Sequence, residues 1–118
     1  MSFEFNSRVS KRKVGEVVVI ELKGRMGLDR EQFAVLRAVL DELEAGHKLF
    51  LLDLQGLDFI DSSGIGELFA IIHKVKKEDG TIRLLHVDDD VGKVLYMVQL
   101  HQMTETFNNE KKAFASFA

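Results

Sequence analysis

The chain has 118 residues, of which 46% are hydrophobic and 30% charged, a balance typical of one globular domain with its own core. The formal net charge of -3 argues against nucleic acid as the main partner, and the absence of cysteine excludes disulfides and thiolate chemistry. No apolar run approaches the roughly 20 residues of a transmembrane helix, and the N-terminus shows no signal-peptide pattern. We therefore expect a cytoplasmic protein that does not insert into membranes.

The first third of the chain predicts two strands and a helix. Alternating side chains indicate a strand over Phe3 to Arg12, and the β-branched run Glu16 to Lys23 indicates a second strand, so the two form a hairpin. Gly24 and Gly27 then end the strand pattern. Asp29 and Gln32 form a capping box for a helix that Gly46 ends.

The rest of the chain alternates strands and helices. Lys48 to Leu54 is apolar enough for a strand covered on both faces, and a loop over Gln55 to Asp61 follows it. The later elements are expected as a helix over Ser62 to Glu78 with the stripe Ile65, Leu68, Phe69, Ile72 and Val75, a strand over Thr81 to Val87, a helix over Asp90 to Gln99, a short strand over Thr104 to Phe107, and a terminal helix capped by Asn108 or Asn109.

This order predicts the fold class. Strands that alternate with helices pair in parallel, whereas the opening hairpin adds an antiparallel edge. We expect an α/β protein in which residues 1–118 form a single domain, with a mixed sheet and about four helices.

The most informative segment is Leu57 to Gly66, LDFIDSSGIG, which connects a buried strand to a helix. Its Asp61, Ser62 and Ser63 stand where the first backbone N–H groups of the helix lack intrahelical partners. Plain helix capping explains one of these side chains. Two consecutive hydroxyls followed by small residues exceed that need and also fit a surface on which a partner docks.

Patterns that would indicate catalysis or metal binding are missing or incomplete. The serines lack the G-x-S-x-G context of a hydrolase nucleophile, and no G-x-x-x-x-G-K-[ST] phosphate loop occurs. Gly64-Ile65-Gly66 begins a dinucleotide motif, but Phe69 replaces its third glycine. The four histidines show no metal-ligand spacing, and Asp88 to Asp90 fit a helix start. Asp53 at a strand end leaves a phosphoacceptor receiver domain as a structural alternative. We expect no catalytic activity, cofactor or metal.

At DFIDSSGIG the chain resembles the STAS domain, a family named for sulfate transporters and anti-sigma factor antagonists. More narrowly, it is similar to the stand-alone bacterial anti-sigma factor antagonists. The resemblance includes the opening strand pair, Gly24, the strand LFLLDL and the helix after the motif. It covers nearly the whole chain, and D-S-S-G-[IL]-G is its most specific part.

The resemblance implies a partner-switching mechanism. In that family the first serine of D-S-S-G is phosphorylated by an anti-sigma factor that is itself a kinase, which makes Ser62 the acceptor here. The unphosphorylated form would bind the anti-sigma factor and free the sigma factor, and a phosphatase would reset Ser62. We place the partner surface on Arg25, Gly27, Asp58, Asp61, Ser62, Ser63, Gly64, Gly66, Glu67 and Ala70.

One part of that surface departs from the family pattern. Related chains commonly carry G-[ED]-[LI]-D after the second strand, whereas this chain has Gly24-Arg25-Met26-Gly27. The exchange removes two acids and adds a cation, which changes the charge offered to a partner. A second functional hypothesis stays open, namely a STAS-type adaptor or scaffold in a signalling or transport complex without a phosphorylation switch.

Overall fold

A five-stranded sheet in the order β1-β2-β3-β4-β5 forms the centre of the protein. The computed structural model describes residues 9–27, 33–87 and 89–118. The strands are β1 (Val9–Val14), β2 (Val17–Met26), β3 (Leu49–Ile60), β4 (Thr81–Leu85) and β5 (Thr106–Phe107). β1 and β2 pair antiparallel and the other neighbours pair in parallel. The mixed sheet is therefore confirmed, and the antiparallel first pair excludes the receiver-type order, in which the sheet is parallel.

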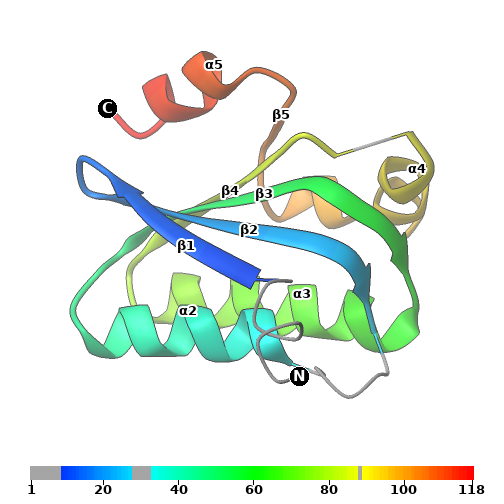
Figure 1. Cartoon of the computed structure of the whole chain (residues 1–118), viewed down its shortest axis with the longest axis horizontal. Helices are drawn as coiled ribbons and strands as arrows, with labels where there is room; N and C mark the ends of the chain where they lie inside the picture. Colours follow the sequence, from blue (N-terminus) through cyan, green and yellow to red (C-terminus); the bar gives the residue numbers. More distant parts are fainter. Residues whose placement is uncertain (1–8, 28–32, 88) are drawn as a thin grey trace.

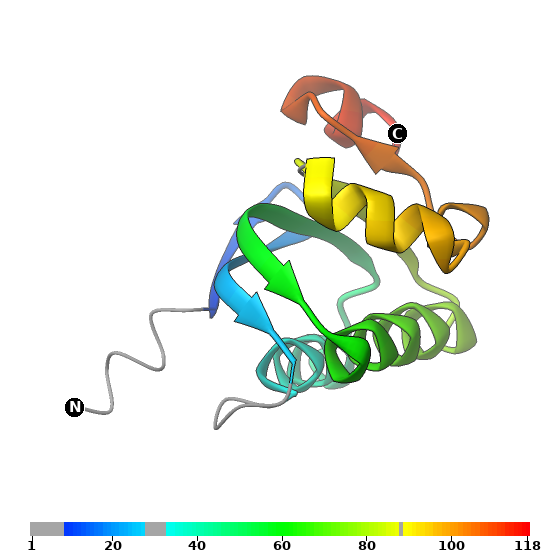
Figure 2. The same cartoon turned by 90° about the vertical axis from the view of Figure 1, so that its right-hand side faces the viewer.

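The helices cover the sheet unequally. They are α2 (Ala34–Glu44), α3 (Ser62–Lys77), α4 (Asp89–Met97), the 3-10 turn η1 (Leu100–Gln102) and α5 (Glu110–Ala115). In Figure 1, α2 and α3 lie side by side beneath the sheet, and the short α5 lies above it. Figure 2 shows α4 beside the curved part of β3, on the side of the sheet toward β5.

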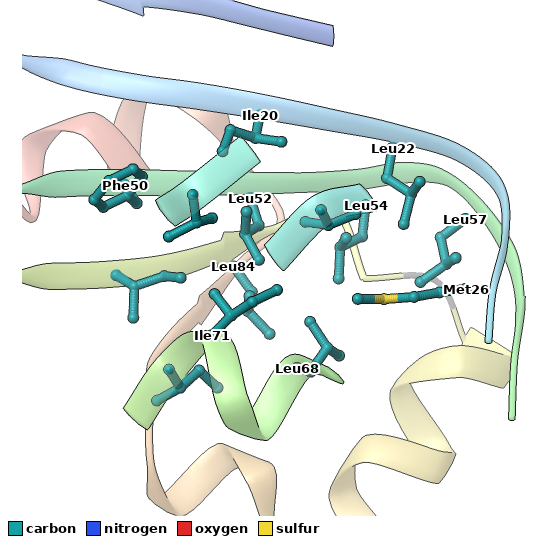
Figure 3. Close-up of a cluster of buried hydrophobic side chains, with 14 of the residues drawn as sticks. Ile20, Leu22, Met26, Phe50, Leu52, Leu54, Leu57, Leu68, Ile71 and Leu84 are labelled. Carbon is teal, nitrogen blue, oxygen red and sulfur yellow. The ribbon is translucent and has the colours of Figure 1, made fainter. Parts of the chain in front are cut away.

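Both faces of the central strands are buried. On the α2 and α3 side, alternate residues of β2 and β3 join α3 in the main core, which Figure 3 shows through Ile20, Leu22, Phe50, Leu52, Leu54, Leu68 and Ile71. The intervening residues Val17, Val19 and Leu51 form a second cluster against Ala113 of α5. The expectation that the third strand is covered on both faces is thus confirmed, since Phe50 and Leu51 both have 0% exposure.

Two strands are longer than the sequence pattern predicts. The expected break at Gly24 and the loop over Gln55 to Asp61 are both wrong, because β2 continues to Met26 and β3 to Ile60. Gly24 takes a positive φ of 94°, and the β2–β3 register shifts beside it. This bulge bends the strands without ending their pairing. The bend carries the carboxyl ends of both strands toward α3.

Other boundaries shift by a few residues. β4 stops at Leu85 because His86 takes a left-handed conformation with φ 57°. Of the two asparagines considered for α5, Asn109 is the cap, and its Oδ1 accepts from the Lys112 N–H at 2.9 Å. The strand expected over Phe3 to Arg12 is described only from Val9 onward. The capping box of Asp29 and Gln32 lies outside the described residues, and α2 begins at Ala34.

Candidate functional site

Ser62 is the first residue of α3 and lies where the two longest strands of the sheet end. Met26 at the end of β2 pairs with Ile60 at the end of β3, and only Asp61 separates Ile60 from the helix. In open α/β sheets, ligands bind beyond the carboxyl ends of the strands. Ser62 is exposed and Ser63 is half-buried. Figure 2 views this end of the molecule, with the start of α3 toward the reader.

Asp61 is the cap of α3. Its Oδ1 accepts from the Gly64 N–H at 2.9 Å, and its backbone carbonyl accepts from the Ile65 N–H at 2.9 Å. Its own N–H donates to the Met26 carbonyl at 3.2 Å, which fastens the helix start to the end of β2. A carboxylate at this position also suits the positive end of the helix dipole. The capping requirement is therefore met without the hydroxyl of Ser62.

Two glycines of the site serve close packing. A Cβ at Gly64 would lie 2.2 Å from the Met26 carbonyl oxygen, and a Cβ at Gly27 would lie 2.3 Å from Oδ1 of Asp61. Both glycines are buried. Gly64 is therefore required by packing, because its missing side chain accommodates the β2 backbone. Gly27 likewise offers a partner no exposed side chain, and an aspartate there would collide with the cap.

The exposed face of α3 matches the expected one except at Glu67. Gly66 and Ala70 are exposed, and nothing lies within 4 Å of a Cβ placed on Gly66. Glu67 was expected to face outward but is only 3% exposed, and its Oε2 accepts from the Leu36 N–H of α2 at 3.0 Å. The reason is the neighbouring helix: α3 buries one side against α2 as well as one against the sheet. The buried side is Gly64, Glu67, Leu68, Ile71, Ile72 and Val75.

Arg25 and Phe59 form an exposed pair beside the serine. The two residues are direct partners across β2 and β3, and the Arg25 guanidinium carbon lies 4.5 Å from the centroid of the Phe59 ring. Phe59 is 44% exposed, and Asp58 next to it is exposed as well. Sequence reasoning included Arg25 and Asp58 but missed Phe59. Because the segment was taken as a loop, no strand partner was assigned to Phe59.

The surface around Ser62 carries polar, charged and aromatic groups together. It combines an exposed hydroxyl, an aromatic ring, a guanidinium and the carboxylates of Asp58 and Asp61. Within the described part of the chain, no group of three or more His, Asp or Glu side chains is arranged to hold a metal ion. None of the described helices is long and apolar enough to cross a membrane.

Comparison with known proteins assigns the family. The STAS domain model matches residues 8–113. The chain belongs to the STAS domain family. The expected resemblance is thereby confirmed over nearly the whole chain, including the strand pair, the D-S-S-G segment and the helix that follows it. No protein with a curated description matches the chain by sequence.

Solved structures show the same STAS fold. TM1081 of Thermotoga maritima, described as a candidate anti-sigma factor antagonist, superposes with a TM-score of 0.83 at 20% identity over 96% of this chain and 97% of its own. The Bacillus protein SpoIIAA in its phosphorylated form gives 0.72 at 23% identity over 93% and 99%. A sulfate transporter family protein from Wolinella succinogenes gives 0.75 at 23% identity over 90% and 88%.

Proposed function

We propose that this STAS protein is an anti-sigma factor antagonist that works by partner switching, with Ser62 as its control point. In the unphosphorylated form it binds an anti-sigma factor that is also a serine kinase, and the sigma factor is released. Phosphorylation of Ser62 ends that binding, and a phosphatase restores it. The chain itself catalyses nothing, and its place of action is the cytoplasm, where sigma factors work.

The proposal is supported by the position of Ser62, which is exposed and does not cap its own helix. Ser62 is exposed at the first position of α3, and the cap of that helix is supplied by Asp61. Modification of Ser62 therefore leaves the cap in place. A phosphate adds about -1.5 to -2 charges, and a helix N-terminus stabilises such a charge. Phosphorylation should leave the fold intact and act on the partner.

The switch follows from charge and bulk. The kinase transfers the γ-phosphoryl group of ATP to Oγ of Ser62, the hydroxyl proton passes to a base of the kinase, and ADP leaves. The new dianion stands beside the carboxylates of Asp58 and Asp61, so the surface becomes strongly acidic. An interface that accommodated a small hydroxyl now meets a larger group whose charge must be desolvated. Exposed residues that share this surface are Arg25, Gly66 and Ala70.

The test uses Ser62 variants against each anti-sigma factor kinase encoded in the same genome, purified separately. With ATP, mass mapping should find phosphate on Ser62 and not on Ser63. Ser62→Asp should bind the cognate kinase about 10-fold more weakly or worse, yet lose less than about 1 kcal/mol of stability. Ser62→Ala should stay bound in the presence of ATP, and Ser63→Ala is the matched control. Equal affinity of wild type and Ser62→Asp would remove the switch from this site.

A second candidate function is that of a STAS adaptor in a transport complex. The likeness to the Wolinella sulfate transporter family protein favours it. Such an adaptor would bind its complex through the same surface with no dependence on Ser62. Unchanged binding of Ser62→Asp to a transporter encoded beside this gene, with no kinase acting on Ser62, would favour the adaptor.

A further inference from the structure

Phe59 is an exposed aromatic ring that the fold does not require for its core. Its neighbours Leu57 and Ile60 are 1% and 8% exposed, whereas Phe59 is 44% exposed. The ring therefore contributes little to the core cluster that those neighbours join. A single exposed apolar residue is common on protein surfaces, so its surroundings decide whether it has a role.

Arg25 orders the ring. The register of β2 and β3 places the two residues opposite each other, and the guanidinium lies over the ring at 4.5 Å from its centroid. A cation at this distance attracts the face of an aromatic ring. The contact thus favours one orientation of the ring before any partner arrives. A ring that is already ordered loses less conformational entropy on binding. Aromatic residues and arginine are also enriched at the centres of interfaces.

Phe59 is also close enough to Ser62 along the chain for one partner to contact both residues. The two residues are three positions apart in the chain, and three residue steps span at most about 11 Å. A stable protein partner covers about 800 Å² on each side, equal to a disc of roughly 16 Å radius. The footprint of a kinase that holds Ser62 in its active site is therefore large enough to include Phe59.

We propose that Phe59, oriented by Arg25, is the anchor through which the anti-sigma factor kinase docks before it reaches Ser62. This inference rests on the proposed function. The partner must offer an apolar pocket large enough for a phenyl ring, with a rim that is neutral or acidic on the side that meets Arg25 and free of acids on the side that meets Asp58. A second copy of this chain fits less well, since a symmetric contact centred on the pair brings two guanidinium groups together.

The experiment measures docking and phosphoryl transfer separately. Each purified kinase is titrated with the full chain in the presence of a non-hydrolysable ATP analogue, and initial rates of Ser62 phosphorylation are measured against chain concentration with ATP. Phe59→Ala should weaken binding and raise KM by about 10-fold or more while kcat changes little. Met97→Ala is the matched control, because Met97 is 80% exposed on α4, and its affinity should stay within about 2-fold of wild type.

Arg25→Gln distinguishes a positioning role from a direct contact. It should weaken binding by about 3-fold to 5-fold in the wild-type background and by less than about 2-fold in the Phe59→Ala background. An equal loss in both backgrounds would overturn the role of Arg25 as the residue that orients the ring. Phe59→Leu keeps apolar bulk but offers no ring face, so its affinity for the kinase should lie between those of wild type and Phe59→Ala. If Phe59→Ala does not fold, Phe59→Leu is compared with wild type instead.

The outcomes separate this inference from the function on which it rests. If the wild-type chain is phosphorylated on Ser62 and Phe59→Ala matches it in affinity and KM, the anchor is wrong and the proposed function stands. If no kinase acts on the wild-type chain, the proposed function fails and the anchor fails with it. If Phe59→Ala instead abolishes self-association in sedimentation while kinase affinity is unchanged, the ring belongs to a contact between copies and the inference is overturned.

Discussion

The two helices beneath the sheet begin side by side but are capped in opposite ways. α3 is capped by the residue directly before it, since Asp61 accepts from the Gly64 N–H. α2 has Phe33 at its cap position, in a left-handed conformation with φ 65° and with no capping side chain. A first-turn donor of α2, the Leu36 N–H, is instead satisfied by Glu67 of α3.

The difference shows that the start of α2 depends on α3, whereas the start of α3 does not depend on α2. The start of α3 is encoded locally and is fastened to β2 through the Asp61 N–H and the Met26 carbonyl. The start of α2 depends on a carboxylate supplied by α3. A change in the first turns of α3 therefore reaches both helices, whereas a change at the start of α2 should remain local.

The largest expected effect is at Gly64, where the local start of α3 meets β2. Gly64→Ala places a Cβ 2.2 Å from the Met26 carbonyl oxygen, and backbone must move. We expect a loss of about 3 kcal/mol in the free energy of unfolding, measured by urea denaturation. Gly66→Ala is the control, because its Cβ meets open space. It should stabilise the protein by up to about 1 kcal/mol, since alanine favours helix.

Removing the Glu67 carboxylate, which accepts from the first turn of α2, tests the dependence of α2 on α3. Glu67→Ala leaves the Leu36 N–H without this acceptor, and we expect a loss of about 2 kcal/mol. Glu67→Gln keeps an acceptor oxygen and should lose less. Hydrogen exchange should rise at amides 34–37 of α2 and stay unchanged at 63–66 of α3. If exchange in Glu67→Ala changed by the same amount at both helix starts relative to wild type, the dependence of α2 on α3 would be contradicted.

A smaller effect is expected at Gly27, which makes room for the local cap. Gly27→Ala would displace the Asp61 carboxylate, because the new Cβ lies 2.3 Å from its Oδ1. Loss of that cap should cost about 1 kcal/mol. Asp61→Ala should cost a similar amount, and the double variant should lose little more than either single one, since both remove the same hydrogen bond. Strict additivity in urea denaturation would show that Gly27 acts by another route.

The smallest expected effect is at the other end of α2, which also depends on a side chain from another element. Glu42 Oε2 accepts from Nζ of Lys11 on β1 at 2.8 Å, and its Oε1 lies 2.7 Å from Nδ1 of His47. The hydrogen bond from Lys11 is the main reason that the pKa of Glu42 lies below its ordinary value of 4.5, and the contact with His47 adds to it. A lowered folded-state pKa stabilises the protein above the unfolded pKa.

That stability should disappear as pH falls through the folded-state pKa of Glu42. Because the pair lies near the surface, we expect no more than about 0.5 kcal/mol. Unfolding free energies measured at about pH 6 and about pH 3 should differ less in Glu42→Gln than in wild type. An identical pH dependence of the two proteins would show that this carboxylate is not coupled to folding.

The comparison of the helix starts also explains where prediction from sequence works. Asp61 was recognised among the helix-start residues because a cap and its amide lie within three residues of each other. The order of elements along the chain, the antiparallel hairpin and the two-sided burial of β3 followed from patterns of similar range. The ends of β2 and β3 could not be predicted in this way. Gly24 in the sequence indicates the end of a strand, and only its pairing with β3 shows that it forms a bulge.

What the sequence by itself determined is therefore the fold class, the family and the position of Ser62 at a helix start. Each rests on periodicity or on a short motif, in which neighbouring residues carry the whole signal. Only the tertiary structure decided that Glu67 is buried, that Gly27 and Gly64 make room for Asp61 and Met26, and that Arg25 lies over Phe59. Those facts depend on the side of α3 against which α2 packs and on the register of two strands. Residues far apart in the chain set both, so no local pattern contains them.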